Sequence, residues 1–245
     1  MVSLIEGEIT QYAKNTVKSP VIEKIFISHQ QILICRGCRK CFDKGENECP
    51  LKDDLLFIRD EIFNADALIV SSPVYVEDVN GIMKNWLDRM AFYCHRSAFL
   101  KKNAILVTTS GSGSSDHALN TMKMALNTWG FYISGKIKCR TGALMTPSEM
   151  KAKYNKKIKG IAKKLVDDFV DQSGEKPTFW GFVVFKVQQR YWQKTINYKD
   201  TLDYNYWKDN GWLDSRSKYY FKTQSSGIKI TTARFVGSFF SLFFK

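Results

Sequence analysis

The stretch ADALIVSSPVYVEDVNGIMKNWLDRM at residues 65–90 decides the fold of this chain, because it joins an apolar strand to an amphipathic helix. Ala67 to Ser71 is a continuous apolar run of strand length, and Val79 to Phe92 has a helical period. Between them, Pro73 fixes its own φ and pushes the preceding residue towards an extended conformation. We therefore expect residues 72–75 to turn sharply and to place an aromatic ring and free backbone groups at the sheet edge.

Strand-length apolar runs alternate with helical segments on both sides of this stretch. The pattern predicts strands at Val21–Ser28, Ala104–Thr109 and Phe131–Ile137, and helices at Leu51–Asn64 and Asp116–Trp129. Continuous apolar runs separated by helices indicate strands that are buried on both faces, hence a parallel sheet with helices on both faces in an α/β fold. Ligands of such folds lie outside the carboxyl ends of the strands.

A loop rich in glycine and serine follows the next predicted strand. The segment Ser110–Ser114, SGSGS, removes Cβ atoms where a ring or a phosphate could touch the backbone, and it leads into a helix. Glycine and serine after one strand most often form only a turn. Suitable loops at two successive strand ends favour a site for a planar ligand.

Four cysteines precede the apolar strand, in the motifs CRGCRKC and ECPLKDD. They are Cys35, Cys38, Cys41 and Cys49. Thiolates at such spacing can hold an iron–sulfur cluster or a tetrahedral metal ion. A zinc site would more often show two separated pairs or a histidine partner, and the nearby His29 lies before the cysteines. A cluster, a zinc site and four reduced thiols that bind nothing all stay open at this point.

Composition agrees with a cytoplasmic protein that has one domain and an appendage. With 44% hydrophobic residues the chain can build a core, and its six cysteines are too few for a disulfide scaffold. In a reducing compartment these cysteines would remain thiols or bind metal. Glu6 and Glu8 interrupt the apolar residues near the start, so we expect no signal peptide.

Basic charge is concentrated in the second part of the chain. Residues 1–150 carry 18 basic and 16 acidic side chains (+2), whereas residues 151–245 carry 19 and 8 (+11). We therefore predict a domain at 1–147 and a basic, aromatic extension at 148–245. Such asymmetry indicates an anionic partner, although a solvated lysine-rich helix explains Lys151 to Lys164 taken alone. No nucleic-acid recognition motif is present, so we expect no nucleic acid as a partner.

The extension is rich in aromatic residues, notably within Phe179–Lys194, so it should be ordered. Ala233–Phe244 is mostly apolar. On a helix, a wide phenylalanine face would lie beside a narrow polar stripe of Thr231, Arg234, Ser238, Ser241 and Lys245. This segment is shorter than the roughly 20 residues that span a bilayer. It should either dock on its own domain or a partner subunit, or lie peripherally on an anionic membrane surface.

Three segments together resemble a known family: CRGCRKCFDKGENECPLKDD at 35–54, the stretch at 65–90, and TTSGSGSS at 108–115. Over residues 20–140 the chain resembles the NADPH-dependent FMN reductase-like flavoproteins of flavodoxin-like fold, which include the iron–sulfur flavoproteins. The resemblance implies FMN as cofactor, NAD(P)H as co-substrate and a homodimer. The residues expected to bind FMN are Ser72, Pro73, Val74 and Tyr75 beside the ring, and Ser110, Gly111, Ser112 and Gly113 at its other edge.

By the same resemblance, Lys84 and Arg89 lie on a helix that often contributes to a dimer interface. A solvated helix face explains these two residues as well.

The chain departs from this family at its start. Members normally begin with a central strand and a glycine/serine loop that holds the FMN phosphate at a helix N-terminus. Nothing of this kind precedes Val21, and Met1 to Asn15 is similar to the later part of the following helix. We expect an N-terminally incomplete domain or a rebuilt sheet that lacks the first strand and the phosphate loop, with weaker FMN binding in either case.

These observations predict an FMN-dependent NAD(P)H oxidoreductase that passes electrons to a quinone, a flavin or a similar small-molecule acceptor. No catalytic side chain is assigned, because the flavin would supply the chemistry. One alternative is an electron-transfer flavoprotein in which the four cysteines hold a [4Fe-4S] cluster. Another is a non-catalytic remnant that binds a membrane or a protein partner. The acceptor and the choice between NADH and NADPH stay open.

Overall fold

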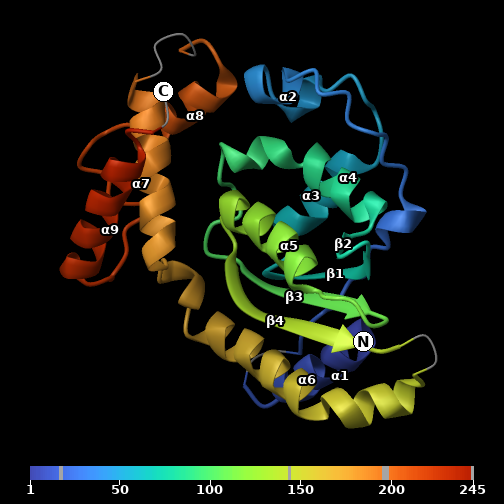
Figure 1. The fold of residues 1–245 in the computed structure, drawn as a ribbon. Coiled ribbons are helices and arrows are strands. Elements are labelled where there is room, and N and C mark those ends of the chain that lie inside the picture. The colour runs from blue at the N-terminus through green and yellow to red at the C-terminus, as the bar shows by residue number, and fades with distance from the viewer. Residues whose placement is uncertain (17–18, 143–144, 195–198, 244–245) are drawn as a thin grey trace.

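One four-stranded sheet organises the first part of the chain (Figure 1). The structure is a computed structural model and describes residues 1–16, 19–142, 145–194 and 199–243. The strands are β1 (Ala67–Tyr75), β2 (Asp78–Val79), β3 (Asn103–Ser110) and β4 (Tyr132–Arg140), in the order β2-β1-β3-β4. β1, β3 and β4 are parallel, and β2 pairs antiparallel with the end of β1. The α/β class predicted from the sequence is confirmed.

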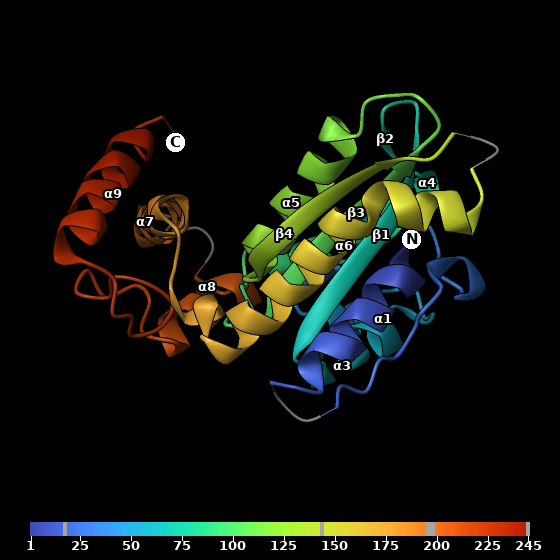
Figure 2. The ribbon, with the colours of Figure 1, turned by 90° about the horizontal axis from the view of Figure 1, so that it is seen from below.

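Helices cover both faces of this sheet, as the sequence predicts (Figure 2). One layer contains α3 (Leu55–Asn64), α4 (Gly81–Arg89) and α5 (Asp116–Trp129), and the other contains α1 (Val2–Ala13) and α6 (Pro147–Val170). β3 is buried between the layers. Its Ala104 and Leu106 pack in the layer of α3, α4 and α5, whereas Ile105 and Val107 pack with α1 and α6.

Local capping explains where several helices begin and end. α3 starts at Leu55, later than predicted, and the Leu55 N–H donates to Asp53 Oδ1 at 3.2 Å. α4 is capped by Asn80, whose side chain accepts from the Met83 N–H at 2.9 Å. α5 has the predicted bounds and ends at Gly130, whose φ of 109° suits glycine.

Two predictions about the strands are wrong. Val21–Ser28 forms no strand: residues 19–26 lack regular structure, and a short 3₁₀ turn, η1 (Ile27–His29), follows. Val21 is 88% exposed, so its apolar side chain does not pack in the core of the sheet. Within the described residues, no strand precedes β1.

The second error concerns the segment Ser72–Tyr75, which continues β1 instead of turning. The fixed φ of Pro73 fits an extended strand near a sheet edge. The chain turns one step later, at Val76 and Glu77, whose φ angles of 51° and 62° form a tight hairpin into β2.

α6 connects the sheet to the C-terminal extension. Thr146 and Glu149 form a capping box around Pro147, which fixes the start of the helix. This start lies close to the boundary between the nearly neutral first part of the sequence and the basic second part. Although α6 is rich in lysine, it buries Ile158, Ile161 and other apolar side chains against α1 and the sheet. In the structure, α6 therefore packs as part of the α/β layers.

The extension beyond α6 is helical. It contains η4 (Ser173–Glu175), α7 (Phe179–Lys194), α8 (Leu202–Asp209) and α9 (Gly227–Phe240). An aromatic cluster of Phe185, Trp192, Trp207 and Trp212 joins α7 to α8 and to the segment that follows it. Among the described residues, no helix has both the length and the apolar character needed to cross a membrane.

The short turn η4 fixes the extension to the start of β3. Lys101 pairs with Glu175 at 2.8 Å, and a Cβ atom on Gly174 would lie 2.2 Å from the Lys101 carbonyl oxygen. Only a residue without a side chain fits between these backbones. On the outer side of α6, in contrast, a Cβ on Gly160 would meet no atom within 4 Å.

We predict opposite effects for alanine at these two glycines. Gly174→Ala should lower the free energy of unfolding by about 1–3 kcal/mol, because the backbone must move. Gly160→Ala, the control, should raise it by about 0.5–1 kcal/mol because alanine favours the helix. Urea unfolding of both variants checks this, and a Gly174→Ala protein as stable as the parent would contradict the contact.

Candidate functional site

The two loops predicted to hold a planar ligand lie at the same edge of the sheet. β1 and β3 are paired in register up to Pro73 and Thr109, so their carboxyl ends finish side by side. The hairpin at Tyr75 follows one strand, and the loop Ser110–Gly113 follows the other. Parallel pairing thus brings together residues that are far apart in the sequence.

The serines of this edge hold the two loops in place. Ser72 Oγ donates to the Pro73 carbonyl at 2.8 Å and accepts from the Asn80 N–H at 3.3 Å. Ser110 Oγ donates to the Gly113 carbonyl at 3.2 Å. Both serines are buried. Their hydroxyl groups are therefore used within the protein, and we assign them a positioning role.

Other predicted site residues remain open to a ligand. Tyr75 is 64% exposed, and Gly111, Ser112 and Gly113 are also exposed. A Cβ on Gly111 or Gly113 would meet no atom within 4 Å, so a flat ring can approach this backbone closely. Pro73 and Val74 are half-buried beneath the hairpin. The residues of this edge fit the ring of a flavin.

The start of α1 lies at this same edge of the sheet. Figure 1 shows the start of α1 beside the arrowhead of β4. The first turn of a helix has backbone N–H groups without intrahelical partners, and such groups attract anions. An anionic group of a ligand at the edge would thus meet favourable charge.

The cysteine loop is a second candidate site and is attached to α4. Asn85 makes three hydrogen bonds to it: its Oδ1 accepts from the Cys35 N–H at 3.3 Å, and its Nδ2 donates to the carbonyls of Ile32 at 3.1 Å and Leu33 at 3.3 Å. At the tip, Gly37 and Arg39 have φ angles of 64° and 63°. These hydrogen bonds give residues 31–39 of the loop a defined path without regular structure.

Arg89 of α4 lies beneath this loop. Its guanidinium donates to Asp53 Oδ2 at 2.5 Å and to the Leu33 carbonyl at 2.7 Å, and it lies 3.9 Å from Cys49 Sγ. Arg89 is buried, so neither a solvated helix face nor an exposed dimer surface explains it, whereas Lys84 forms a surface pair with Asp88. Sequence reasoning missed this role because Arg89 and Asp53 are distant in the chain.

The four thiols differ in exposure. Cys35 and Cys38 are exposed, and Cys41 and Cys49 are half-buried. Burial raises the pKa of the Cys41 thiol to about 11, and the neighbouring Cys49 and Cys35 raise it further when charged. Three of the four cysteines are therefore close enough to interact electrostatically. As free thiols they would release protons on binding metal.

The donor set fits an iron–sulfur cluster in its chemistry: thiols on one loop, beside a guanidinium that would offset negative charge. Within the described residues, no group of three or more Cys, His, Asp or Glu side chains is placed to hold a single metal ion. A cluster holds its cysteine sulfurs further apart than a single ion does. The four cysteines therefore stay predicted ligands.

A second buried arginine links the cysteine loop to the extension. Arg96 donates to the Cys41 carbonyl at 3.0 Å, pairs with Glu46 at 3.0 Å, and pairs with Asp203 of α8. Asp203 also contacts His95 Nδ1 at 2.7 Å. α8 thus lies beside the short helix α2 (Lys40–Asp43), which carries Cys41. No spacing in the sequence indicated this bridge.

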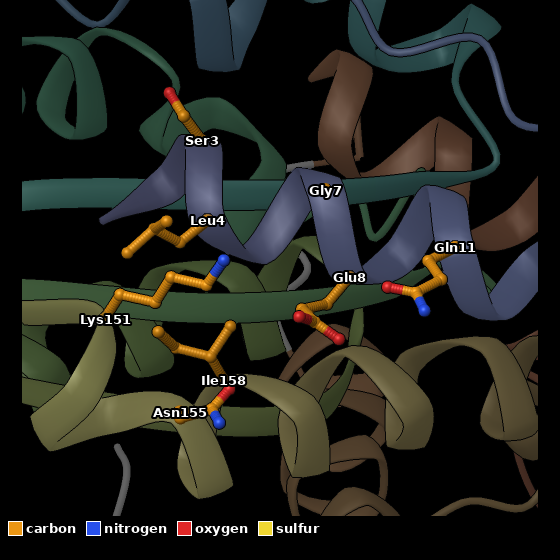
Figure 3. A pocket seen from close by; sticks show the side chains of 8 residues that line it. All are labelled: Ser3, Leu4, Gly7, Glu8, Gln11, Lys151, Asn155 and Ile158. Atoms are coloured by element: carbon orange, nitrogen blue, oxygen red, sulfur yellow. The ribbon is translucent and has the colours of Figure 1, made fainter. Parts of the chain in front are cut away.

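A shallow cavity has a lining separate from that of both predicted sites. It has a volume of about 220 Å³ and lies between α1 and α6 (Figure 3). Its lining includes Glu8 and Gln11 of α1 and Lys151 and Asn155 of α6. No residue predicted for the flavin or the cysteine site lines this cavity.

Comparisons with known proteins agree with this architecture. The model of the NADPH-dependent FMN reductase family matches residues 7–138. The chain belongs to the NADPH-dependent FMN reductase family. It is 29% identical over 195 residues to an iron–sulfur flavoprotein of Archaeoglobus fulgidus, covering 78% of this chain and 85% of the relative.

Two solved structures share the fold at low sequence identity. An oxidoreductase of Corynebacterium diphtheriae has a TM-score of 0.50 and 17% identity, covering 69% of this chain and 86% of that one. RosB with bound 8-demethyl-8-formylriboflavin-5'-phosphate has a TM-score of 0.50 and 13% identity, covering 92% and 86%. They support a flavodoxin-like fold.

The Arg89–Asp53 pair predicts a pH-dependent stability. Burial by itself would raise the pKa of Asp53, but hydrogen bonds from Arg89, Leu33 and Leu55 lower it below its usual value. The ionised carboxylate therefore stabilises the fold above the unfolded pKa of about 3.9, and this contribution is lost as the pH falls through the lower folded value.

Asp53→Asn should accordingly cost about 3–5 kcal/mol at pH 7, because it leaves a buried guanidinium unpaired. The difference in the free energy of unfolding between this variant and the parent should become smaller as the pH is lowered from 4 towards 2. Asp88→Asn, which breaks the exposed pair with Lys84 on α4, should cost less than about 1 kcal/mol. Denaturant unfolding across this pH range measures all three proteins, and a pH-independent cost would refute the assignment.

Proposed function

We propose that this chain is an FMN-dependent NAD(P)H oxidoreductase that reduces a flat small-molecule acceptor such as a quinone or a flavin. The observation that supports it is the meeting of the exposed Tyr75 hairpin and the open Ser110–Gly113 loop at one carboxyl edge. When bound, FMN would accept a hydride from the nicotinamide and pass electrons to the acceptor.

The residues of the edge would position the ring and leave one of its faces accessible. Tyr75 offers an aromatic side chain with more than half of its surface free. The backbone at Gly111 and Gly113 can approach the ring without a Cβ between them. Ser72 and Ser110 keep both loops in place through their internal hydrogen bonds. No side chain needs to act as acid or nucleophile in this proposal.

A direct experiment separates this function from the alternatives. The purified chain is mixed with FMN, freed of unbound cofactor, and treated with NADPH and then NADH without oxygen. Loss of the flavin absorption, and its return when a quinone is added, would support the reductase. A chain that retains no flavin would instead favour a non-catalytic binding protein.

For the flavin site we predict that Tyr75→Ala weakens FMN binding by about two- to tenfold, the effect of losing one aromatic contact. Because Tyr75 is largely exposed, stability should hardly change. Phe57→Ala, which removes an exposed aromatic side chain from α3, is the matched control and should leave FMN affinity unchanged. Fluorescence titration of FMN measures all three affinities, and equal values for Tyr75→Ala and the parent would remove Tyr75 from the site.

A second candidate function is electron transfer through a [4Fe-4S] cluster on the cysteine loop. One observation favours it: the Arg89 guanidinium lies 3.9 Å from Cys49 Sγ, beside the loop that carries the four thiols. The relative from Archaeoglobus fulgidus is named an iron–sulfur flavoprotein. In this proposal Cys35, Cys38, Cys41 and Cys49 would ligate the cluster, which would relay single electrons.

The cluster hypothesis predicts a selective loss of iron. In protein purified without oxygen, replacing Cys38 or Cys41 with serine should abolish bound iron and sulfide and the associated visible absorption. Cys94→Ser, a half-buried cysteine outside the loop, should retain all three. Iron and sulfide assays on the parent and the variants provide the measurement. A parent without iron would contradict the cluster, and variants that keep their iron would remove Cys38 and Cys41 from its ligands.

A further inference from the structure

The helix α9 packs against α7 through its small residues. Its buried residues are Ile230, Ala233 and Gly237. The first two pack in one cluster with Phe182 and Val183 of α7, and Gly237 lies against the Val183 backbone. A Cβ on Gly237 would lie 2.8 Å from the Val183 carbonyl oxygen, so the two helices touch where this residue has no side chain. The docking face of α9 is therefore not its phenylalanine face.

The large apolar residues of α9 and the turn after it point away from the protein. Each of these side chains is more than half exposed: Ile228 (78%), Phe235 (77%), Phe239 (56%), Leu242 (65%) and Phe243 (72%). Their spacing places them along one helix face. Figures 1 and 2 both show α9 as the outermost element, with α7 between it and the sheet. Of the alternatives left open by the sequence, packing of this face on its own domain is therefore wrong.

The two segments that form and flank this exposed stripe carry basic but no acidic residues. Residues 179–194, which form α7, and residues 215–243 contain no aspartate or glutamate. The basic residues of the two helices are Lys186, Arg190, Lys194, Lys229 and Arg234. Burial, together with the charges of Arg234 and Arg190, lowers the pKa of Lys186 to about 8. Lys186 is buried, so the exposed positive charge of α7 comes from Arg190 and Lys194.

We propose that the α7–α9 pair is a docking surface for an anionic lipid bilayer, with the exposed stripe of α9 inserted at headgroup depth. An apolar helix face with basic charge around it is the combination that binds interfacially to anionic lipid. A second copy of this chain is a poor occupant, because it would bring the same positive charge against itself. The proposal does not depend on the redox chemistry of the sheet.

The test uses the full chain and two kinds of vesicle, pure phosphatidylcholine and a mixture with phosphatidylglycerol. Co-sedimentation should show binding to the anionic vesicles and weaker binding to the neutral ones. Binding should fall as salt rises from 0.05 to 0.5 M, because the attraction is screened over about 10 Å at 0.1 M. The triple variant Phe235→Ser, Phe239→Ser, Phe243→Ser should bind at least about tenfold more weakly.

A matched control and a stability measurement complete the experiment. Phe26→Ser with Phe57→Ser removes exposed phenylalanines from the sheet domain and should bind vesicles as the parent does. The triple variant should keep its melting temperature within about 2 °C, because its changes are on the surface. A parent that ignores anionic vesicles, or a triple variant that binds them equally, overturns the proposal. So does a parent dimer that the triple variant converts to monomers, since the stripe would then be a subunit interface.

Discussion

Burial of β3 on both faces is the constraint on which the rest of the structure depends. Its backbone is satisfied by parallel pairing with β1 and β4, but its side chains need an apolar layer above and below. Three helices supply one layer, and α1 and α6 supply the other. α6 is 24 residues long, which corresponds to about 36 Å, so it runs back along the whole sheet from its carboxyl edge. The extension therefore starts at the opposite edge, beside Lys101.

Two buried guanidinium groups then determine how the irregular cysteine loop is held. Each removes a charge from water, which is costly unless the geometry is good and the remaining hydrogen bonds are made. Arg89 meets this condition with Asp53 and the Leu33 carbonyl. Arg96 meets it with Glu46, Asp203 and two loop carbonyls. Because Asp203 belongs to α8, the environment of Cys41 depends on the extension as well as on the sheet domain.

The sequence predicts best what rests on local pattern. β3 and α5 were found within a residue or two because a continuous apolar run and a helical period need no distant partner. Val21–Ser28 has the composition of a strand, yet a strand also needs a neighbour to pair with, and composition does not supply one. Residues 72–75 were expected to turn, but proline is as compatible with an extended edge as with a turn.

Long-range pairs and the choice of docking face lay outside such reasoning. Arg89 and Asp53 are 36 positions apart, and Arg96 and Asp203 are 107 apart, so no spacing rule connects them. The amphipathic pattern of α9 was visible, but the pattern alone does not say which face is covered. Ala233 and Gly237 determine which face of α9 is covered, because small residues allow the closest approach to α7.

The path of α6 also fixes how the two candidate surfaces are oriented. The carboxyl edge with Tyr75 lies at one end of the sheet, and α9 lies beyond the other end, as Figures 1 and 2 both show. A chain held on a bilayer by α9 would thus turn the edge proposed to bind flavin towards water. Nicotinamide cofactors, which are dissolved in water, would reach that edge freely. A quinone buried among lipid tails would not, so membrane attachment in this orientation would favour a water-soluble acceptor.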